Sequence, residues 1–166
     1  VKAILEDEPY PVRAVLLFGS NPLLTYANSQ QVYQALNRIE FLVVAELFMT
    51  PTAELADLAL PAATNLEFNE IGFYGPRTSQ VVARRKVIEP VGECWPDMKI
   101  INELAKRLDF GEHFWDDPAE CLDLILKPAG LSYEELKSKV MARAAKRYRK
   151  HEENGFDTPS GKVELY

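Results

Sequence analysis

The chain has 166 residues, of which 47% are hydrophobic and 27% charged, and this is enough for one ordinary domain with a hydrophobic core. Its formal net charge of −6 argues against nonspecific nucleic-acid binding, so we expect no nucleic acid among its partners. No apolar run approaches the roughly 20 residues of a membrane-spanning helix, so we expect no direct membrane insertion.

Two short apolar runs near the start predict buried strands. Residues 15–18 and 41–45 are rich in Val, Leu and Phe, and a helical pattern follows each of them. Such runs are typical of strands that are covered on both faces of a parallel sheet, and their alternation with helices indicates βαβ units. Residues 58–60 predict a third, very short strand. We therefore expect an α/β fold, a three-layer Rossmann-like domain with a mainly parallel sheet and helices on both faces.

The rest of the chain predicts a loop, an outer strand and further helices. Residues 62–77 are expected to form a long ordered loop. Residues 81–83 and 87–88 are expected to form an outer strand that is broken by the basic residues 84–86. Amphipathic spacing predicts helices over 97–108 and 118–126. A capping box at residues 132–135 predicts a long helix that ends near His151. Its basic C-terminal part is typical of a solvated face, and we favour this over a phosphate-binding patch.

The polar residues that follow the first predicted strand are candidates for a binding site. Ligands of parallel sheets bind just past the carboxyl ends of the strands, which is where Gly19, Ser20 and Asn21 fall. A glycine lets a ligand approach the backbone, and the two polar side chains can bind phosphate or a base edge. The dinucleotide fingerprint GxGxxG is absent. A strand-to-helix turn that binds no ligand could have the same sequence as this loop.

The end of the second predicted strand supplies further candidates. Glu46 is an acid in a position that commonly accepts hydrogen bonds from ribose hydroxyls. Thr50 and Thr52 flank the start of a predicted short helix, whose amides can hold an anion, although Thr50 also suits a simple cap. Asp57, near the end of that helix, suits either capping or binding.

No residues are assigned to catalysis or to metal binding. Cys94 and Cys121 are far apart in the sequence, which argues against an iron–sulfur cluster or a zinc site. His113 and His151 lie in polar or basic surroundings typical of the surface. No nucleophile is paired with a base, and no two carboxylates are spaced for acid–base work. The residues therefore indicate a binder of a nucleotide-like group.

The order of these segments resembles the third domain of the molybdopterin oxidoreductases, the dimethyl sulfoxide reductase superfamily. The segments are GSNP after a strand, VVAELFMTPTAELADLALPAAT, a Glu-containing loop, the Gly/Arg element at residues 74–77, PVGECWPDMKIINELAKRL and the tail TPSGKVELY. The similarity covers most of the chain in a consistent order.

The resemblance implies that the chain binds one guanine dinucleotide arm of the bis-molybdopterin cofactor, molybdopterin guanine dinucleotide with Mo or W. By position, three residues of the first loop would line the dinucleotide, Glu46 would take the acid position at the nucleotide, two threonines would approach the phosphate or sugar, and Arg77 would help to close the site. With Asp57, the implied cofactor-binding set is Gly19, Ser20, Asn21, Glu46, Thr50, Thr52, Asp57 and Arg77. Glu46 replaces the commoner Asp, and FYGPR replaces the usual N-x-E-G-R, which leaves the role of Arg77 open.

The resemblance also predicts the domain organisation and the partners. Residues 1–154 would form the Rossmann-like cofactor-binding domain, and residues 155–166 a linker and the start of the following dinucleotide-binding domain. The whole enzyme would transfer electrons or oxygen atoms at the metal, while the fragment alone would be inactive and without the cofactor. The predicted partners are the remaining domains of the same polypeptide and an iron–sulfur electron-transfer subunit, on either the cytoplasmic or the periplasmic side.

Two alternatives to this function stay open at the level of sequence. One is a cofactor-free structural homologue in a redox or respiratory complex, against which the intact GSNP and TPTAELAD segments count. The other is a non-redox nucleotide-binding domain, such as the central domain of a thiamine-diphosphate enzyme. It would not explain the ordered segments that continue through TPSGKVELY.

Overall fold

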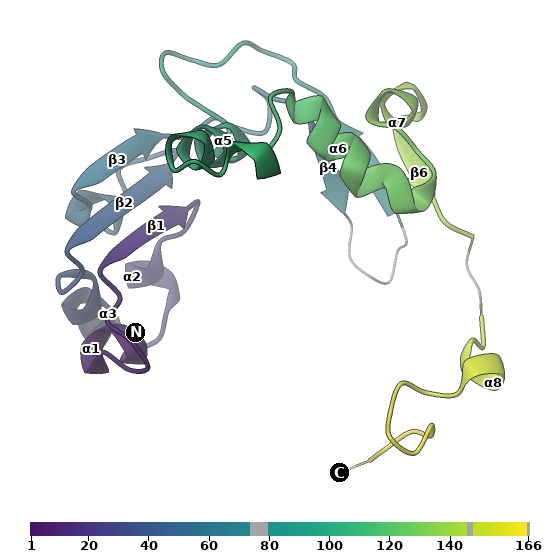
Figure 1. Ribbon diagram of the computed structural model, residues 1–166, viewed down its shortest axis with the longest axis horizontal. Coiled ribbons are helices and arrows are strands. Elements are labelled where there is room, and N and C mark those ends of the chain that lie inside the picture. Colours follow the sequence, from purple (N-terminus) through teal and green to yellow (C-terminus); the bar gives the residue numbers. More distant parts are fainter. Residues whose placement is uncertain (74–79, 146–147, 166) are drawn as a thin grey trace.

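The structure of the protein is a computed structural model, which describes residues 1–73, 80–145 and 148–165. Two separate three-stranded sheets form, with α5 (Asp97–Arg107) between them (Figure 1). The first sheet contains β1 (Ala14–Phe18), β2 (Phe41–Glu46) and β3 (Leu58–Pro61), and the second contains β4 (Glu70–Phe73), β5 (Gln80–Arg84) and β6 (Met141–Arg143). In this described part, no helix is both long enough and apolar enough to cross a membrane.

The first sheet confirms the parallel arrangement predicted for the three apolar runs. Its strands lie in the order β1-β2-β3, and Val43 of β2 pairs in parallel with Leu16 of β1 and Leu58 of β3. Three helices precede or connect these strands: α1 (Lys2–Glu6), α2 (Pro22–Thr25) and α3 (Ser29–Leu36). The predicted helix after β2 is only a single 3-10 turn, η1 (Ala53–Leu55).

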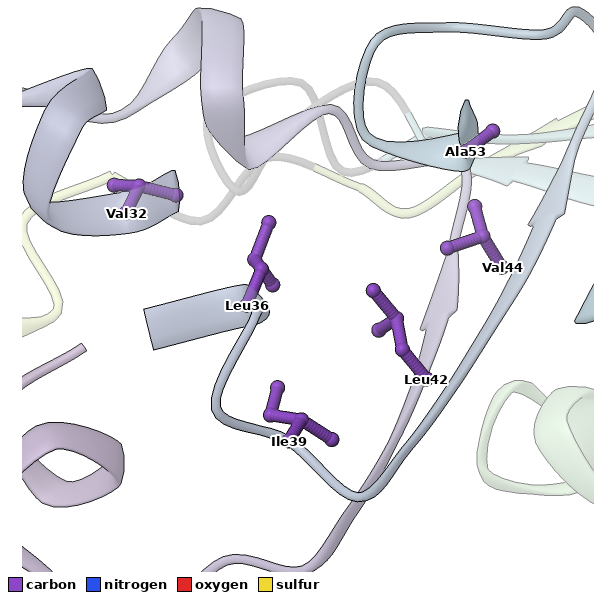
Figure 2. Packing of buried hydrophobic residues seen from close by; sticks show 6 residues of the cluster. All are labelled: Val32, Leu36, Ile39, Leu42, Val44 and Ala53. Carbon is purple, nitrogen blue, oxygen red and sulfur yellow. The ribbon is translucent and has the colours of Figure 1, made fainter. Parts of the chain in front are cut away.

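One face of this sheet carries the first hydrophobic core. Side chains alternate along β2, so Leu42 and Val44 point to the same face, and both are almost completely buried. They pack with Val32 and Leu36 of α3 (Figure 2), which lie four residues apart on one side of that helix. The predicted cap of α3 is confirmed, because the Asn28 side chain accepts a hydrogen bond from Gln31 N at 3.2 Å.

The opposite face of the sheet lines an open apolar groove. Leu16, Val43 and Leu58 lie on this face and line a cavity of about 770 Å³, across which stand Ile100 and Leu104 of α5. The helices therefore lie on both sides of the sheet, as predicted, although α5 packs more loosely than the helices on the other face. Leu58 keeps 45% of its surface exposed.

A second core, which the sequence analysis did not predict, lies under an antiparallel sheet. The strands β4, β5 and β6 are paired in that order, and α6 (Pro118–Leu126) and α7 (Tyr133–Lys139) pack against them. The core residues are buried and come from both helices and two strands: Ile71, Ala83, Leu122, Leu126, Tyr133 and Leu136. Two short 3-10 turns, η2 (Gly111–His113) and η3 (Lys127–Ala129), connect the helices of this region.

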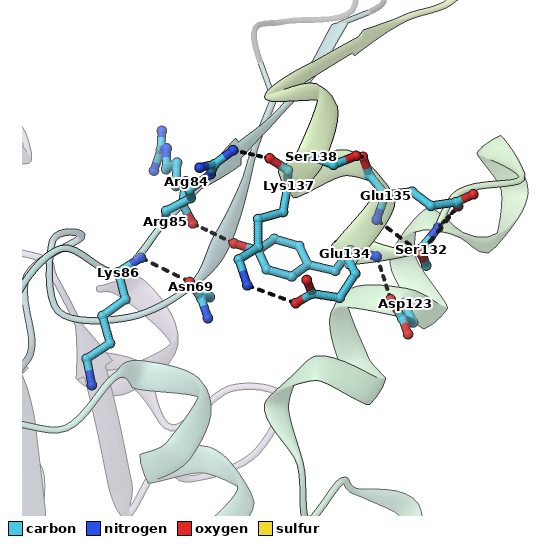
Figure 3. Close-up of polar contacts among 11 residues, drawn as sticks. Asn69, Arg84, Arg85, Lys86, Asp123, Ser132, Glu134, Glu135, Lys137 and Ser138 are labelled. Carbon is cyan, nitrogen blue, oxygen red and sulfur yellow. Dashed lines mark hydrogen bonds and ion pairs between the residues drawn. The ribbon is translucent and has the colours of Figure 1, made fainter.

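Polar contacts join α7 to its neighbours (Figure 3). Asp123 Oδ1 accepts a hydrogen bond from Tyr133 N at 2.6 Å, and the Tyr133 hydroxyl donates to Arg84 O at 2.7 Å. The Tyr133 ring is buried, and burial raises the pKa of its hydroxyl. These contacts fix α7 to both α6 and β5.

The prediction of a long helix that ends near His151 is wrong about the length of the helix. The capping box is present, since Ser132 Oγ accepts from Glu135 N at 3.2 Å and Ser132 N donates to Glu135 Oε2 at 2.9 Å. However, α7 ends at Lys139, and Val140 adopts a left-handed φ of 66°. The chain then pairs with the free edge of β5, where Ala83 N donates to Val140 O at 2.9 Å. Pairing with this edge replaces the continued helix.

After β6, the residues that the structure describes form only short local structure. The helix α8 (His151–Asn154) is followed by turns, in which Gly161 N donates to Thr158 O at 3.0 Å. The domain boundary expected between residues 154 and 155 stays a prediction.

The loop that follows β3 is ordered by a buried carboxylate. Glu67 is only 4% exposed and accepts hydrogen bonds from the backbone N–H groups of Thr64 and Val91, both at 2.6 Å. Nearby, Ala62 and Trp95 form a parallel bridge next to the end of β3. Glu67 therefore connects the loop after β3 to the segment that leads into α5.

Replacing Glu67 by glutamine should lower the stability of the chain most strongly at neutral pH. The hydrogen bonds from Thr64 and then Val91 lower the pKa of the Glu67 carboxyl. A carboxylate whose pKa is lowered by folding stabilises the fold above its unfolded pKa of about 4.3, and this stabilisation is lost as the pH falls through the folded pKa. Urea unfolding across a pH series should show the difference between wild type and variant shrinking below about pH 4. The exposed Glu93→Gln is the control, and a difference at Glu67 that does not change with pH would contradict this role.

Candidate functional site

The strand register brings the first two candidate segments together at the carboxyl edge of the parallel sheet. Phe18 pairs with Ala45, and Gly19 N donates to Ala45 O at 3.0 Å. The loop that begins at Gly19 therefore lies beside Glu46, the last residue of β2. This is the edge at which ligands of parallel sheets bind.

Gly19 is in a conformation that favours glycine and leaves the backbone accessible. Its φ is +49°, and a Cβ built on it would meet no atom within 4 Å. The open space beside the backbone allows a ligand to come close.

Replacing Gly19 by alanine should cost about 1–2 kcal/mol of unfolding free energy, because an L residue is disfavoured at positive φ. No steric clash adds to this cost, since nothing lies near the new Cβ. Gly130→Ala is a matched control, with a φ of +65° and the same open surroundings. Urea unfolding should show similar losses for both variants, and unchanged stability in Gly19→Ala would contradict the assigned backbone conformation.

Asn21 and Thr52 contact one another instead of both facing a ligand. The Thr52 hydroxyl donates to Asn21 Oδ1 at 2.6 Å and accepts from Leu23 N at 3.2 Å. Thr52 is fully buried, while Asn21 and Ser20 are half-buried. In the part of the chain that the structure describes, the Ser20 hydroxyl and the Asn21 amide nitrogen have no hydrogen-bond partner. Thr52 therefore joins the two loops from inside.

Glu46 is the last residue of β2 and Thr50 follows it closely, and the side chain of each accepts one hydrogen bond from the backbone. Glu46 Oε1 accepts from Leu47 N at 2.8 Å, and Oε2 has no partner within the described ranges. Thr50 Oγ1 accepts from Ala53 N at 3.2 Å, although the N-cap position of the turn η1 is Thr52 and not Thr50. Because Thr50 Oγ1 is the acceptor in this bond, the Thr50 hydroxyl proton is available to a ligand.

A third acid, Asp97, lies near this edge and was missed by the sequence analysis. Partial burial raises the pKa of Asp97, and the nearby charges of Glu70 and Glu46 raise it further. Asp97 is the first residue of α5, and its only signal in the sequence was the start of a helix. The edge thus carries negative charge on the side of Glu46, while the side of Gly19 carries none.

One of the candidate residues, Asp57, is not brought to this edge. Asp57 Oδ2 accepts from Leu42 N at 2.7 Å, and Asp57 N donates to Leu42 O at 2.9 Å. Leu42 is near the start of β2, so Asp57 lies at the amino edge of the sheet and connects β2 with the start of β3. Arg77 lies outside the described residues.

An exposed apolar segment directly follows Glu46 and was not singled out from the sequence. Leu47, Phe48 and Met49 are consecutive, and Phe48 keeps 76% of its surface exposed. Leu24 and Tyr26, in the segment that follows β1, are exposed as well. The sequence does indicate this segment, because three apolar residues lie between Glu46 and a turn, where loops usually carry polar residues.

The arrangement can bind a polar ligand, but it holds no catalytic set. Ser20 and Asn21, in the loop after β1, supply donors, and Glu46, at the end of the adjacent strand β2, supplies an acceptor. Among the described residues, no group of three or more His, Cys, Asp or Glu side chains is placed to hold a metal ion. The large groove under the sheet differs from this edge, because its lining is mostly apolar.

Comparisons with known proteins agree with the family that the motifs indicate. A family profile described as molybdopterin oxidoreductase matches residues 2–107. Acetylene hydratase of Syntrophotalea acetylenica is 39% identical over 99% of this chain and 23% of its own length. The F420-dependent formate dehydrogenase subunit alpha of Methanocaldococcus jannaschii is 32% identical over 69% of this chain and 17% of its own length.

A solved structure supports the same relationship. Acetylene hydratase from Pelobacter acetylenicus superposes with a TM-score of 0.87 at 36% identity, and the match covers 99% of this chain and 23% of that chain. The chain thus spans about a quarter or less of the relatives that it matches. The α/β fold with its parallel sheet is shared with this structure, and the family implies a molybdopterin-type cofactor with Mo or W. On this evidence the chain belongs to the molybdopterin oxidoreductase family.

Proposed function

We propose that the carboxyl edge of β1 and β2 binds one nucleotide arm of a molybdopterin guanine dinucleotide cofactor. The observation that carries this proposal is the position of Gly19 beside Glu46 at the ends of adjacent parallel strands. An accessible backbone and free donors at this edge suit the phosphate of a nucleotide. A carboxylate at the same edge suits the hydroxyls of its ribose.

The donor set of the chain fits this ligand. The carboxylate of Glu46 is an acceptor and suits the hydroxyls of a ribose or the N–H groups of guanine. The free groups of Ser20 and Asn21 are donors and suit phosphate or carbonyl oxygens. Phe48, exposed beside Glu46, offers an aromatic face against which a purine base can stack.

Within the whole protein, this domain would bind and orient the cofactor while other domains supply the metal ligand. The whole protein would then transfer electrons or oxygen atoms at Mo or W, in contact with the remaining domains and with an iron–sulfur electron-transfer subunit. The names of the relatives include both a hydratase and a formate dehydrogenase, so a domain of this kind serves more than one reaction. The site as proposed here consists of Gly19, Ser20, Asn21, Glu46 and Thr50, with Thr52 behind it.

Titration of guanosine diphosphate into the ¹⁵N-labelled chain tests this function. The free chain supplies only one side of the site, so we expect a dissociation constant in the high micromolar to millimolar range, about −4 to −6 kcal/mol. Amide shifts should map to residues 19–21 and 46–50. Shifts confined to the basic residues 137–150 would overturn the proposed site. So would the absence of shifts with about 10 mM nucleotide, roughly tenfold above the weakest expected dissociation constant of about 1 mM.

A further inference from the structure

The first turn of α2 is capped by a residue that is distant in the sequence. Asn21 occupies the N-cap position, where an Asn side chain normally accepts a hydrogen bond from the second or third residue of the helix. Asn21 makes no such bond, and Leu23 N instead donates to Thr52 Oγ1 at 3.2 Å. Because Thr52 accepts the bond from Leu23 N, the Asn21 side chain does not cap the helix. It accepts a hydrogen bond from the Thr52 hydroxyl instead.

The proton of the Thr52 hydroxyl decides which way the Asn21 amide must point. Thr52 is fully buried, so its hydroxyl proton needs an acceptor inside the protein. The partners of Thr52 Oγ1 in the described structure are Leu23 N, which can only donate, and the Asn21 side chain. The acceptor must therefore be Asn21 Oδ1, because the reversed amide would leave a buried hydroxyl proton unsatisfied.

From this geometry we infer that Thr52 is a positioning residue, which fixes the Asn21 amide so that its Nδ2 is the group presented to the nucleotide. The inference rests on the proposed function for the identity of the ligand, but not for the orientation of Asn21. Asn21 then acts only as a donor, and its counterpart on the ligand is an acceptor such as a phosphate or carbonyl oxygen. Glu46, an acceptor, takes the complementary groups of the ligand.

The orientation of Asn21 is tested without any ligand. The ¹⁵N–¹H heteronuclear NOE of the Asn21 side-chain NH₂ should be as high as that of Asn37, whose Nδ2 is fixed by Tyr33 O at 2.8 Å. Thr52→Ser keeps the hydroxyl and should keep this value. Thr52→Val keeps the shape but removes the hydroxyl, and should lower the value to that of a mobile side chain. A low NOE in the wild type would overturn the inference even if no variant could be purified.

Binding of guanosine diphosphate gives an independent readout. Thr52→Val should weaken binding roughly five- to tenfold, Thr52→Ser less than about twofold, and Asn21→Ala about as much as Thr52→Val. In the double variant Asn21→Ala/Thr52→Val the effects should not add, because the hydroxyl acts through Asn21. Additive losses would overturn the positioning role. If the wild type binds no nucleotide while its Asn21 amide is ordered, the proposed function fails and the orientation of Asn21 stands.

Discussion

Leu136→Ala should lower the free energy of unfolding by about 2–5 kcal/mol, the cost of truncating a fully buried leucine. Leu136 has no exposed surface and packs in the second core with Leu122, Leu126 and Tyr133. Removing its side chain leaves a cavity under the antiparallel sheet. Tyr133, one of its neighbours, is held by hydrogen bonds to Asp123 and to Arg84 O, so it cannot move into the cavity without breaking them.

The loss should be local to the second core. The two hydrophobic clusters share no residue, so amide exchange should become faster in β5 and remain slow in β2. Leu124→Ala on α6 is the matched control, because Leu124 is 53% exposed and its truncation should cost less than about 0.5 kcal/mol. Equal loss of protection in β2 and β5 would show that the chain unfolds as one unit and would contradict this division.

Glu46→Ala should weaken the binding of guanosine diphosphate by about 1.5–3 kcal/mol, the value of a hydrogen bond to a charged group. This corresponds to a dissociation constant that is about 10- to 150-fold higher. One Glu46 oxygen accepts from Leu47 N and the other has no partner in the described chain, so the variant loses a group that is available to the ligand. Calorimetric titration at neutral pH measures the change.

Asp57→Asn is the matched control for Glu46. Asp57 is an acid at the end of the TPTAELAD segment that follows Glu46, but its carboxylate accepts from Leu42 N at the amino edge of the sheet. The variant should lower the stability and leave the dissociation constant unchanged. Weaker binding in Asp57→Asn together with unchanged binding in Glu46→Ala would move the site to the other edge.

The parallel sheet and its carboxyl edge could be predicted because the signals are local. Continuous apolar runs predict buried strands, and the edge follows from their parallel order, which places Gly19 and Glu46 together without any knowledge of side chains. The motif that resembles the family lies on these same segments, so the fold and the proposed ligand were indicated together.

The second sheet and the role of Thr52 could not be predicted because they depend on contacts between distant segments. The strand β6 has only three residues, and its pairing with β5 ends a helix whose capping box gave a correct start. Thr52 and Asn21 are 31 positions apart, so nothing in the sequence distinguishes a buried hydroxyl from one that faces a ligand. From its residue type, Asp57 could either cap a helix or bind a ligand. Only the strand register shows that it lies at the amino edge of the sheet.

The most direct test of the central claim is an isotope-filtered NOE experiment on the labelled chain with unlabelled guanosine diphosphate. We expect contacts from the nucleotide protons to Gly19, Ser20 and the ring of Phe48, all at the carboxyl edge. Contacts to Leu58 and Leu104, without any to Gly19, would place the nucleotide in the apolar groove and contradict the account.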